Sequence, residues 1–141
     1  MKKRYVFIGA SGRAMYMYAR PMVQELAEYA AIVGIYDPNP LRIEALKEMA
    51  GADCPAYNDC DRMLAEQKPD VAIVTTMDRY HHEYIIKSLE AGMDVITEKP
   101  MTIDEEKCNA ILEAEKRTGR KIIVTFNYRF APYVTAIKQG I

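Results

Sequence analysis

The stretch RYVFIGASGRA, residues 4–14, runs from an apolar segment directly into a glycine-containing turn. A strand that enters a helix through such a turn is typical of a dinucleotide-binding loop, because glycine permits a tight turn and close approach of the backbone to a pyrophosphate. Ser11 and Ala14 replace the second and third glycines of the usual pattern, and both side chains are small. By itself the stretch fits an ordinary strand-to-helix turn equally well, so the rest of the chain has to decide.

Short apolar runs alternate with longer amphipathic segments along the chain. The runs expected to form strands are 4–8, 31–36, 55–57, 71–75, 94–97 and 122–125. The segments expected to form helices are 21–29, 41–49, 60–66, 79–90 and 103–118, with Asp78 as one N-cap and Thr102 with Glu105 as a capping box. Repeated strand–helix–strand units predict an α/β fold, a doubly wound parallel sheet of Rossmann type.

Composition and charge exclude several classes of protein. The 141 residues carry a formal net charge of -1, which gives no basic surface for nucleic acid. No apolar run is long enough to span a membrane. Three cysteines without a CxxC spacing favour free thiols over a disulfide framework or a zinc site. We therefore expect a cytoplasmic protein that binds neither nucleic acid nor membrane, and we predict no metal site.

An acidic residue, Asp37, ends the second expected strand. At this position a carboxylate can accept hydrogen bonds from the adenosine ribose hydroxyls of a dinucleotide, although an Asp before Pro38 also suits a turn. The negative charge would repel a 2′-phosphate and so favours NAD. Arg42 is near enough in sequence to pair with that phosphate, which keeps NADP as the alternative.

The stretch TEKPM, residues 97–101, follows the fifth expected strand. Ligands of doubly wound sheets bind beyond the carboxyl ends of the strands, so Glu98 and Lys99 should emerge into the crevice that the Gly-rich turn also borders. Lys99 could polarise or protonate a substrate oxygen there. Pro100 would restrict Lys99 to an extended backbone and so keep the amine directed away from the sheet.

The only two histidines of the chain, His81 and His82, are adjacent on the helix that precedes this strand. His81 shares a helical face with Ile85 and Leu89, so its side chain should point inward at the end where a ligand would lie. His82 shares part of that face, and a core or capping histidine explains the pattern as well.

Four segments together resemble the N-terminal dinucleotide-binding domain of the Gfo/Idh/MocA oxidoreductases. They are FIGASGRA, YDPNPLRIEAL, VAIVTTMDRYHHEYIIKSLEAGMDVITEKPM and TFNYRFAPYVTAIKQGI. The combination of T-x-x-x-x-H, AGMDV-x-x-EKP and NYRF-x-P is far more specific than the glycine pattern alone. The resemblance implies a Rossmann domain over residues 1–125 and, over residues 126–141, the start of the connection to a C-terminal α+β substrate domain that this chain lacks.

The resemblance also implies a role for individual residues. Thr76 and His81 would lie beside the nicotinamide half of the cofactor, and Glu98 would lie near the nicotinamide ribose. Lys99 would bind the substrate hydroxyl and assist proton movement, which makes it the predicted catalytic residue. The predicted cofactor-binding set is Gly9, Ser11, Gly12, Arg13, Asp37, Arg42, Thr75, Thr76, His81, Glu98, Lys99, Pro100 and Arg129.

Membership of this family would imply hydride transfer between NAD, or NADP, and a secondary alcohol of a sugar, polyol or related compound. Two alternatives stay open, an NAD-dependent glycoside hydrolase of the same family and a non-catalytic dinucleotide sensor. The full-length protein is expected to be a cytoplasmic homo-oligomer that acts on a small sugar-like substrate. The present chain alone should bind dinucleotide but turn over little.

Overall fold

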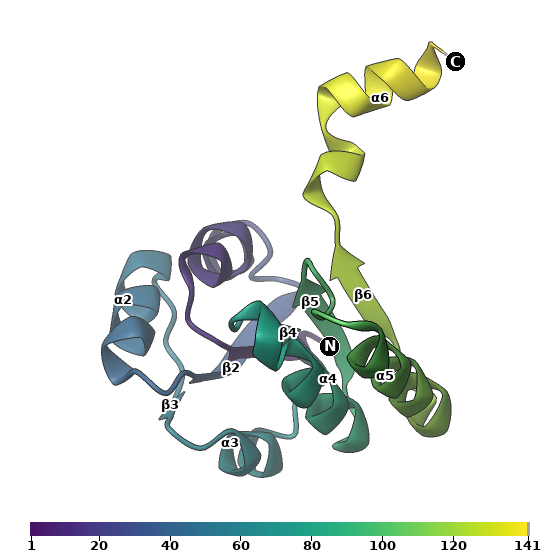
Figure 1. Cartoon of the computed structure of the whole chain (residues 1–141). Helices are drawn as coiled ribbons and strands as arrows, with labels where there is room; N and C mark the ends of the chain where they lie inside the picture. Colours follow the sequence, from purple (N-terminus) through teal and green to yellow (C-terminus); the bar gives the residue numbers. More distant parts are fainter. Residues whose placement is uncertain (141) are drawn as a thin grey trace.

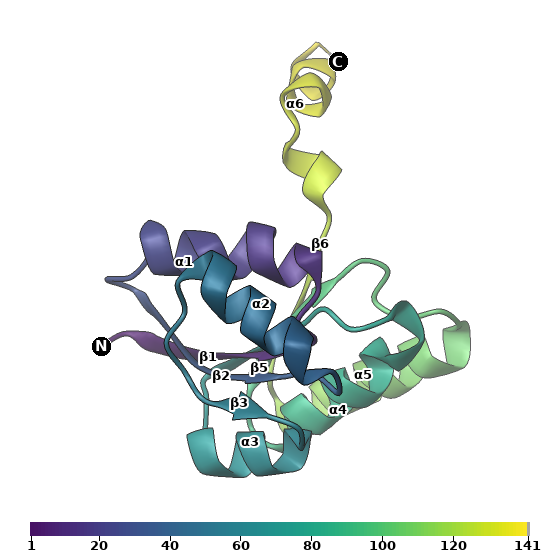
Figure 2. The ribbon, with the colours of Figure 1, turned by 90° about the vertical axis from the view of Figure 1, so that its left-hand side faces the viewer.

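The computed structural model describes residues 1–140, which form one parallel sheet with helices on both faces (Figures 1 and 2). The strands are β1 (Lys3–Ile8), β2 (Ala30–Tyr36), β3 (Ala56–Tyr57), β4 (Val71–Val74), β5 (Asp94–Glu98) and β6 (Ile122–Thr125). Their order in the sheet is β3-β2-β1-β4-β5-β6, and every neighbouring pair is parallel. This is the doubly wound order, with its switch point between β1 and β4. The predicted fold class is confirmed, and each predicted strand end lies within one residue of the observed one.

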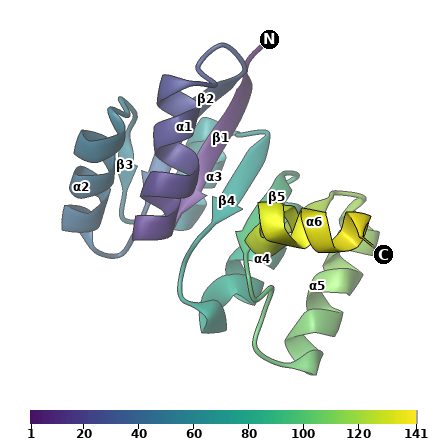
Figure 3. The same cartoon turned by 90° about the horizontal axis from the view of Figure 1, so that it is seen from above.

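The helices form one layer on each face of the sheet. The π-helix η1 (Ala14–Ala19), its continuation α1 (Arg20–Gln24) and α2 (Pro40–Ala50) cover one face. On the other face lie α3 (Cys60–Gln67), α4 (His81–Glu90), which follows the 3₁₀ turn η2 (Asp78–Tyr80), and α5 (Glu105–Thr118). In Figure 3, α1 and α2 lie on one side of β4, and α4 and α5 lie on the other. The last turn η3 (Asn127–Phe130) and helix α6 (Pro132–Gln139) extend away from the sheet (Figure 1).

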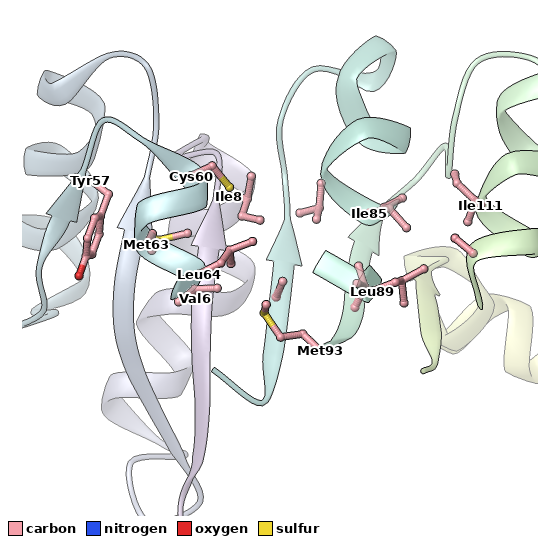
Figure 4. Packing of buried hydrophobic residues seen from close by; sticks show 14 residues of the cluster. Val6, Ile8, Tyr57, Cys60, Met63, Leu64, Ile85, Leu89, Met93 and Ile111 are labelled. Carbon is pink, nitrogen blue, oxygen red and sulfur yellow. The ribbon is translucent and has the colours of Figure 1, made fainter. Parts of the chain in front are cut away.

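Two apolar clusters fill the space between the sheet and its two helical layers. Along β1, Val6 and Ile8 pack toward α3, α4 and α5, as Figure 4 shows, whereas Phe7 packs toward η1, α1 and α2. Successive side chains of a strand point to opposite faces, and here both faces are covered. This explains why the strands read as continuous apolar runs rather than as an alternating pattern.

The first predicted helix is wrong in its position. It was expected over residues 21–29 but is observed over 14–24, as η1 followed by α1. Pro21 falls in the first turn of α1, where the missing N–H is tolerated, so it marks the change from π-helix to α-helix and not the start of the helix.

Two predicted helix caps are also wrong. Asp104, not Thr102, caps α5, because its carboxylate accepts a hydrogen bond from the Lys107 amide at 2.9 Å. Asp78 lies inside η2, and α4 has no side-chain cap. Before α4 the chain adds the 3₁₀ turn η2, and before α5 it continues as irregular chain to Asp104, so each helix starts later than the capping residue that the sequence suggests.

Over residues 1–140 no helix combines the length and the apolar character that a membrane crossing needs. Over the same residues no three His, Cys, Asp or Glu side chains gather in a way suited to a metal ion.

Candidate functional site

The turn after β1 touches the end of β4 at Gly9. This residue has a φ of 99°, and a Cβ on it would lie 2.8 Å from both the carbonyl carbon of Thr75 and the amide nitrogen of Thr76. The Gly9 amide donates to the carbonyl of Tyr36 at 2.8 Å, and the Thr75 hydroxyl donates to the carbonyl of Gly9 at 2.6 Å. Because a side chain would collide with this backbone, glycine lets the ends of β1, β2 and β4 meet.

Asp37, directly after β2, is buried with 4% of its surface exposed. Its Oδ2 accepts a hydrogen bond from the Ala10 amide at 2.8 Å, and its Oδ1 accepts one from the Asn39 amide at 2.9 Å. The carboxylate therefore holds the Gly-rich turn against the end of β2. An ionised carboxylate has about four acceptor positions, so each oxygen can still accept from a ligand hydroxyl.

A first cavity of about 410 Å³ lies at the carboxyl ends of β1, β2 and β4. Its wall combines aromatic rings, a buried carboxylate and backbone of the Gly-rich turn. The lining residues are Gly9, Ser11, Tyr36, Asp37, Pro38, Arg42, Thr75, Thr76, Met77, Tyr80, Glu83 and Tyr84. Mostly apolar walls with a few placed polar groups are typical of a small-molecule site, and this mixture suits a flat base joined to a ribose.

Glu98, the last residue of β5, is buried among polar side chains. Its Oε1 accepts hydrogen bonds from the Tyr18 hydroxyl at 2.8 Å and from the Thr125 hydroxyl at 3.1 Å. Its Oε2 lies 3.6 Å from Nε of Arg13. Burial, as the largest cause, raises the pKa of Tyr18 to about 12, so this phenol remains a neutral donor at physiological pH. The cluster ties η1, β5 and β6 together and fixes the carboxylate beside Arg13.

A second cavity of about 370 Å³ lies beyond β5 and β6. It is lined by Arg13, Lys99, Phe126, Asn127 and Tyr128. Lys99 follows β5 directly and its side chain is exposed, and the Lys99–Pro100 peptide bond is cis. Ser11 lines the first cavity and Arg13 lines the second, so the Gly-rich turn lies between them. An extended ligand laid over this turn would reach both cavities.

His81, the first residue of α4, is 1% exposed. Its Nδ1 lies 2.8 Å from the carbonyl oxygen of Pro100, and its Nε2 lies 3.1 Å from the carbonyl oxygen of Thr76. The side chain points inward, as the helical spacing predicts, while the neighbouring His82 is partly exposed. The His81 ring thus contacts the turns that follow β4 and β5.

Comparison with known proteins places this geometry in a family. Residues 3–126 match the GFO_IDH_MocA family, described as an oxidoreductase family with an NAD-binding Rossmann fold. This chain belongs to the Gfo/Idh/MocA oxidoreductases. Its sheet and Gly-rich turn are therefore those of an NAD-binding Rossmann domain, and the predicted family and cofactor are confirmed.

Several named proteins are similar in sequence to this chain. YteT of Bacillus subtilis (strain 168), whose name describes it as an oxidoreductase, is 38% identical over 143 residues, which cover 99% of this chain and 33% of YteT. D-glucoside 3-dehydrogenase of Escherichia coli (strain K12) is 31% identical over 100 residues, which cover 71% of this chain and 28% of that enzyme. The chain therefore spans about a third of the length of these relatives.

Solved structures of the family superpose closely on this domain. The WlbA dehydrogenase from Chromobacterium violaceum, crystallised with NADH and UDP-GlcNAcA, matches with a TM-score of 0.88 at 26% identity, over 99% of this chain and 39% of WlbA. Scyllo-inositol dehydrogenase from Lactobacillus casei, crystallised with NAD(H) and scyllo-inositol, matches with a TM-score of 0.85 at 21% identity, over 99% of this chain and 40% of that enzyme. At 21% identity, the similarity to scyllo-inositol dehydrogenase shows the fold alone.

The residues predicted from the Gfo/Idh/MocA resemblance are divided among the two cavities, the buried groups around them and exposed positions nearby. Gly9, Ser11, Asp37, Arg42, Thr75 and Thr76 line the first cavity, and Arg13 and Lys99 line the second. Glu98, His81 and the carbonyl of Pro100 are bonded to other protein groups, while Gly12 has open space at its Cβ position. Arg129 is exposed on η3 and lines neither cavity. The division follows from the Gly-rich turn, which occupies the middle of the site.

Some residues of this Gfo/Idh/MocA site were missed by the sequence reasoning. Tyr18 and Thr125 bond Glu98, and the hydroxyls of Tyr36 and Tyr84 lie 3.1 Å apart in the wall of the first cavity. A helix starting at residue 14 would have placed Tyr18 one turn from Ala14, facing the sheet. The position of Tyr36 beside Asp37 at a strand end was a signal that could have been used.

Proposed function

We propose that the protein carrying this chain is an NAD-dependent oxidoreductase that transfers a hydride between the nicotinamide and a secondary alcohol of a sugar, polyol or related compound. Residues 1–125 would form its cofactor domain, and residues 126–141 would lead to a substrate domain. The observation that carries the proposal is the position of Lys99. Its exposed side chain lines the second cavity, and the Gly-rich turn lies between this cavity and the first cavity, which Asp37 lines. The names of similar proteins, D-glucoside 3-dehydrogenase and inositol 2-dehydrogenase, support the class of substrate.

The residues present fit a dinucleotide. The first cavity would take the adenosine, with Asp37 accepting from the ribose hydroxyls, and the turn from Gly9 to Arg13 would carry the pyrophosphate at the start of a helix. The second cavity, next to Glu98, would receive the nicotinamide half. Because Asp37 is a buried carboxylate, a 2′-phosphate placed beside it would be repelled, which favours NAD over NADP despite the exposed Arg42.

When bound, the nicotinamide supplies the hydride acceptor or donor. The chain's own residues bind and orient the reactants. In the oxidation direction the neutral amine of Lys99 would accept the proton that the substrate hydroxyl loses, and in the reduction direction the ammonium would return that proton to the oxygen. Phe126 and Tyr128 form apolar walls of the second cavity and would exclude water from it.

The test uses the full-length protein, NAD⁺ and a panel of substrates comprising inositols, D-glucosides and UDP-sugar acids, with formation of NADH followed by absorbance. For the best substrate, Lys99→Ala should lower kcat by ~10²- to 10⁴-fold, the range of a general acid–base group, and leave the affinity for NADH within about three-fold. Lys99→Arg should rescue poorly, since a planar guanidinium does not replace an ammonium. Lys116→Ala, an exposed lysine of α5, is the matched control and should behave as wild type.

Three outcomes would count against the proposal. Near-normal turnover by Lys99→Ala would remove the proposed role of the amine. Release of an aglycone from a glycoside with no net NADH would instead indicate an NAD-dependent glycoside hydrolase. Tight NADH binding with no turnover of any member of the panel would favour a dinucleotide sensor.

A further inference from the structure

The imidazole of His81 is fully committed to two backbone carbonyls. Its Nδ1 is 2.8 Å from the Pro100 oxygen and its Nε2 is 3.1 Å from the Thr76 oxygen, in a side chain that is 1% exposed. Carbonyl oxygens only accept hydrogen bonds, so each ring nitrogen can bond its neighbour only as a donor. Neither nitrogen is left to contact a cofactor or a substrate directly.

The number of ring protons decides how many of these bonds form. A neutral imidazole carries one N–H and bonds one carbonyl, whereas the doubly protonated ring bonds both. The contact to Pro100 is the shorter of the two, and on that ground we assign the proton of the neutral ring to Nδ1. The turn that contains Pro100 is thereby attached to the first turn of α4.

The two carbonyls belong to the two halves of the site. Thr76 lines the first cavity, and its amide lies against Gly9. Pro100 directly follows Lys99, which lines the second cavity. We propose that His81 is a positioning residue, whose ring holds the Lys99–Pro100 turn against the first turn of α4 and so sets where the Lys99 amine lies. This inference rests on the proposed role of Lys99.

Substitutions of His81 can distinguish the effect of the hydrogen bonds of the ring from the effect of its volume. Phe at position 81 keeps a buried ring but has no donor. Asn places its side-chain nitrogen the same number of bonds from Cα as Nδ1, and Gln places its nitrogen the same number as Nε2. Asn therefore retains a donor for Pro100, and Gln retains one for Thr76.

In the full-length enzyme, His81→Phe should lower kcat by ~10- to 10²-fold, the effect of misplacing a catalytic group by about 1 Å. The affinity for NADH should stay within about three-fold of wild type. His81→Asn should recover most of the loss and His81→Gln less, because only Asn restores the bond to the lysine turn. His82→Phe, on the same helix turn and partly exposed, is the matched control and should retain full turnover.

A second measurement uses the present chain and needs no substrate. The amide chemical shifts of Lys99 and Met101, on either side of Pro100, should change in His81→Phe and stay as in wild type in His82→Phe. In the unsubstituted chain, nitrogen NMR of the two histidines should show the Nδ1 proton of His81 in a slowly exchanging bond.

The results separate this inference from the proposed function. If Lys99→Ala abolishes turnover while His81→Phe is as active as wild type, only the positioning role is overturned. The role is equally overturned if Asn is no better than Phe, or if Nδ1 of His81 carries no proton. If Lys99→Ala retains turnover, the proposed function itself fails, and the NMR measurements on the present chain still report whether His81 holds the turn.

Discussion

Replacing Gly9 by alanine tests whether the meeting of β1, β2 and β4 depends on the absence of a side chain. In the structure a Cβ at this position lies 2.8, 2.8 and 2.9 Å from backbone atoms of Thr75 and Thr76, and these atoms are not the movable end of a side chain. The residue also has a φ of 99°, which an L-residue adopts at a cost of about 1–2 kcal/mol. Overpacking adds about 1–3 kcal/mol. Gly9→Ala should therefore lower the free energy of unfolding by about 2–5 kcal/mol.

Thermal unfolding followed by circular dichroism measures this loss. At roughly 2.1 cal/mol/K per residue, a chain of 141 residues unfolds with an entropy of about 0.3 kcal/mol/K, so Tm should fall by about 7–17 °C. Gly12→Ala is the matched control in the same turn, because no atom lies within 4 Å of its Cβ position. Its Tm should change by less than about 2 °C. A Tm for Gly9→Ala as close to wild type as that of Gly12→Ala would refute the reasoning.

Three further predictions follow from buried polar groups. Asp37→Asn should lower the free energy of unfolding by about 1–3 kcal/mol, because the new side-chain NH₂ group would face a backbone N–H. The same substitution should reduce the ratio of NADH affinity to NADPH affinity. An unchanged ratio in calorimetry would argue against the role of Asp37 at the ribose. Tyr18→Phe removes a hydrogen-bond donor to Glu98, so it should lower the free energy of unfolding by about 1 kcal/mol and weaken NADH binding. Tyr16 is 54% exposed, and Tyr16→Phe should change neither quantity. Equal effects of the two substitutions would contradict this prediction. Burial raises the pKa of the Cys60 thiol to about 12, above its unfolded value, so the contribution of this thiol to stability should be constant below a pH of about 9 and should be lost as the pH rises toward 12. Denaturant melts of Cys60→Ala should show a smaller fall in stability over this range than wild type, and an identical fall would exclude this thiol as a cause.

The sheet could be predicted from the sequence because its signal is local. Each strand is a short apolar run between polar turns, and the two helical layers keep both faces of the central strands buried. The helix starts could not be predicted as well. Thr102 and Asp104 are both good capping residues, and only the path of the chain after Pro100 decides that Asp104 bonds the Lys107 amide. Pro21 does not mark where the first helix begins, since a proline is also tolerated within the first turn.

In the candidate site, too, contacts between residues far apart in the sequence could not be predicted. Asp37 could be predicted because an acidic residue at the end of the second strand, after a Gly-rich turn at the end of the first, is a sequence feature. The partners of Glu98 could not, because Tyr18 and Thr125 lie 80 and 27 residues away along the chain. The inward direction of His81 followed from helical spacing, but its partners are backbone carbonyls, which every residue has and no sequence pattern distinguishes.

The central claim is that one dinucleotide crosses the Gly-rich turn, with its adenosine beside Asp37 and its nicotinamide beside Lys99. Amide chemical shifts of this 16.1 kDa chain, titrated in parallel with AMP and with NADH, test the claim most directly. AMP should shift the amides of Asp37, Thr76 and Met77 in the first cavity and leave those of Lys99 and Asn127 unchanged, whereas NADH should shift both sets. Shifts by NADH confined to the first cavity, or found at the amino ends of the strands, would contradict the account.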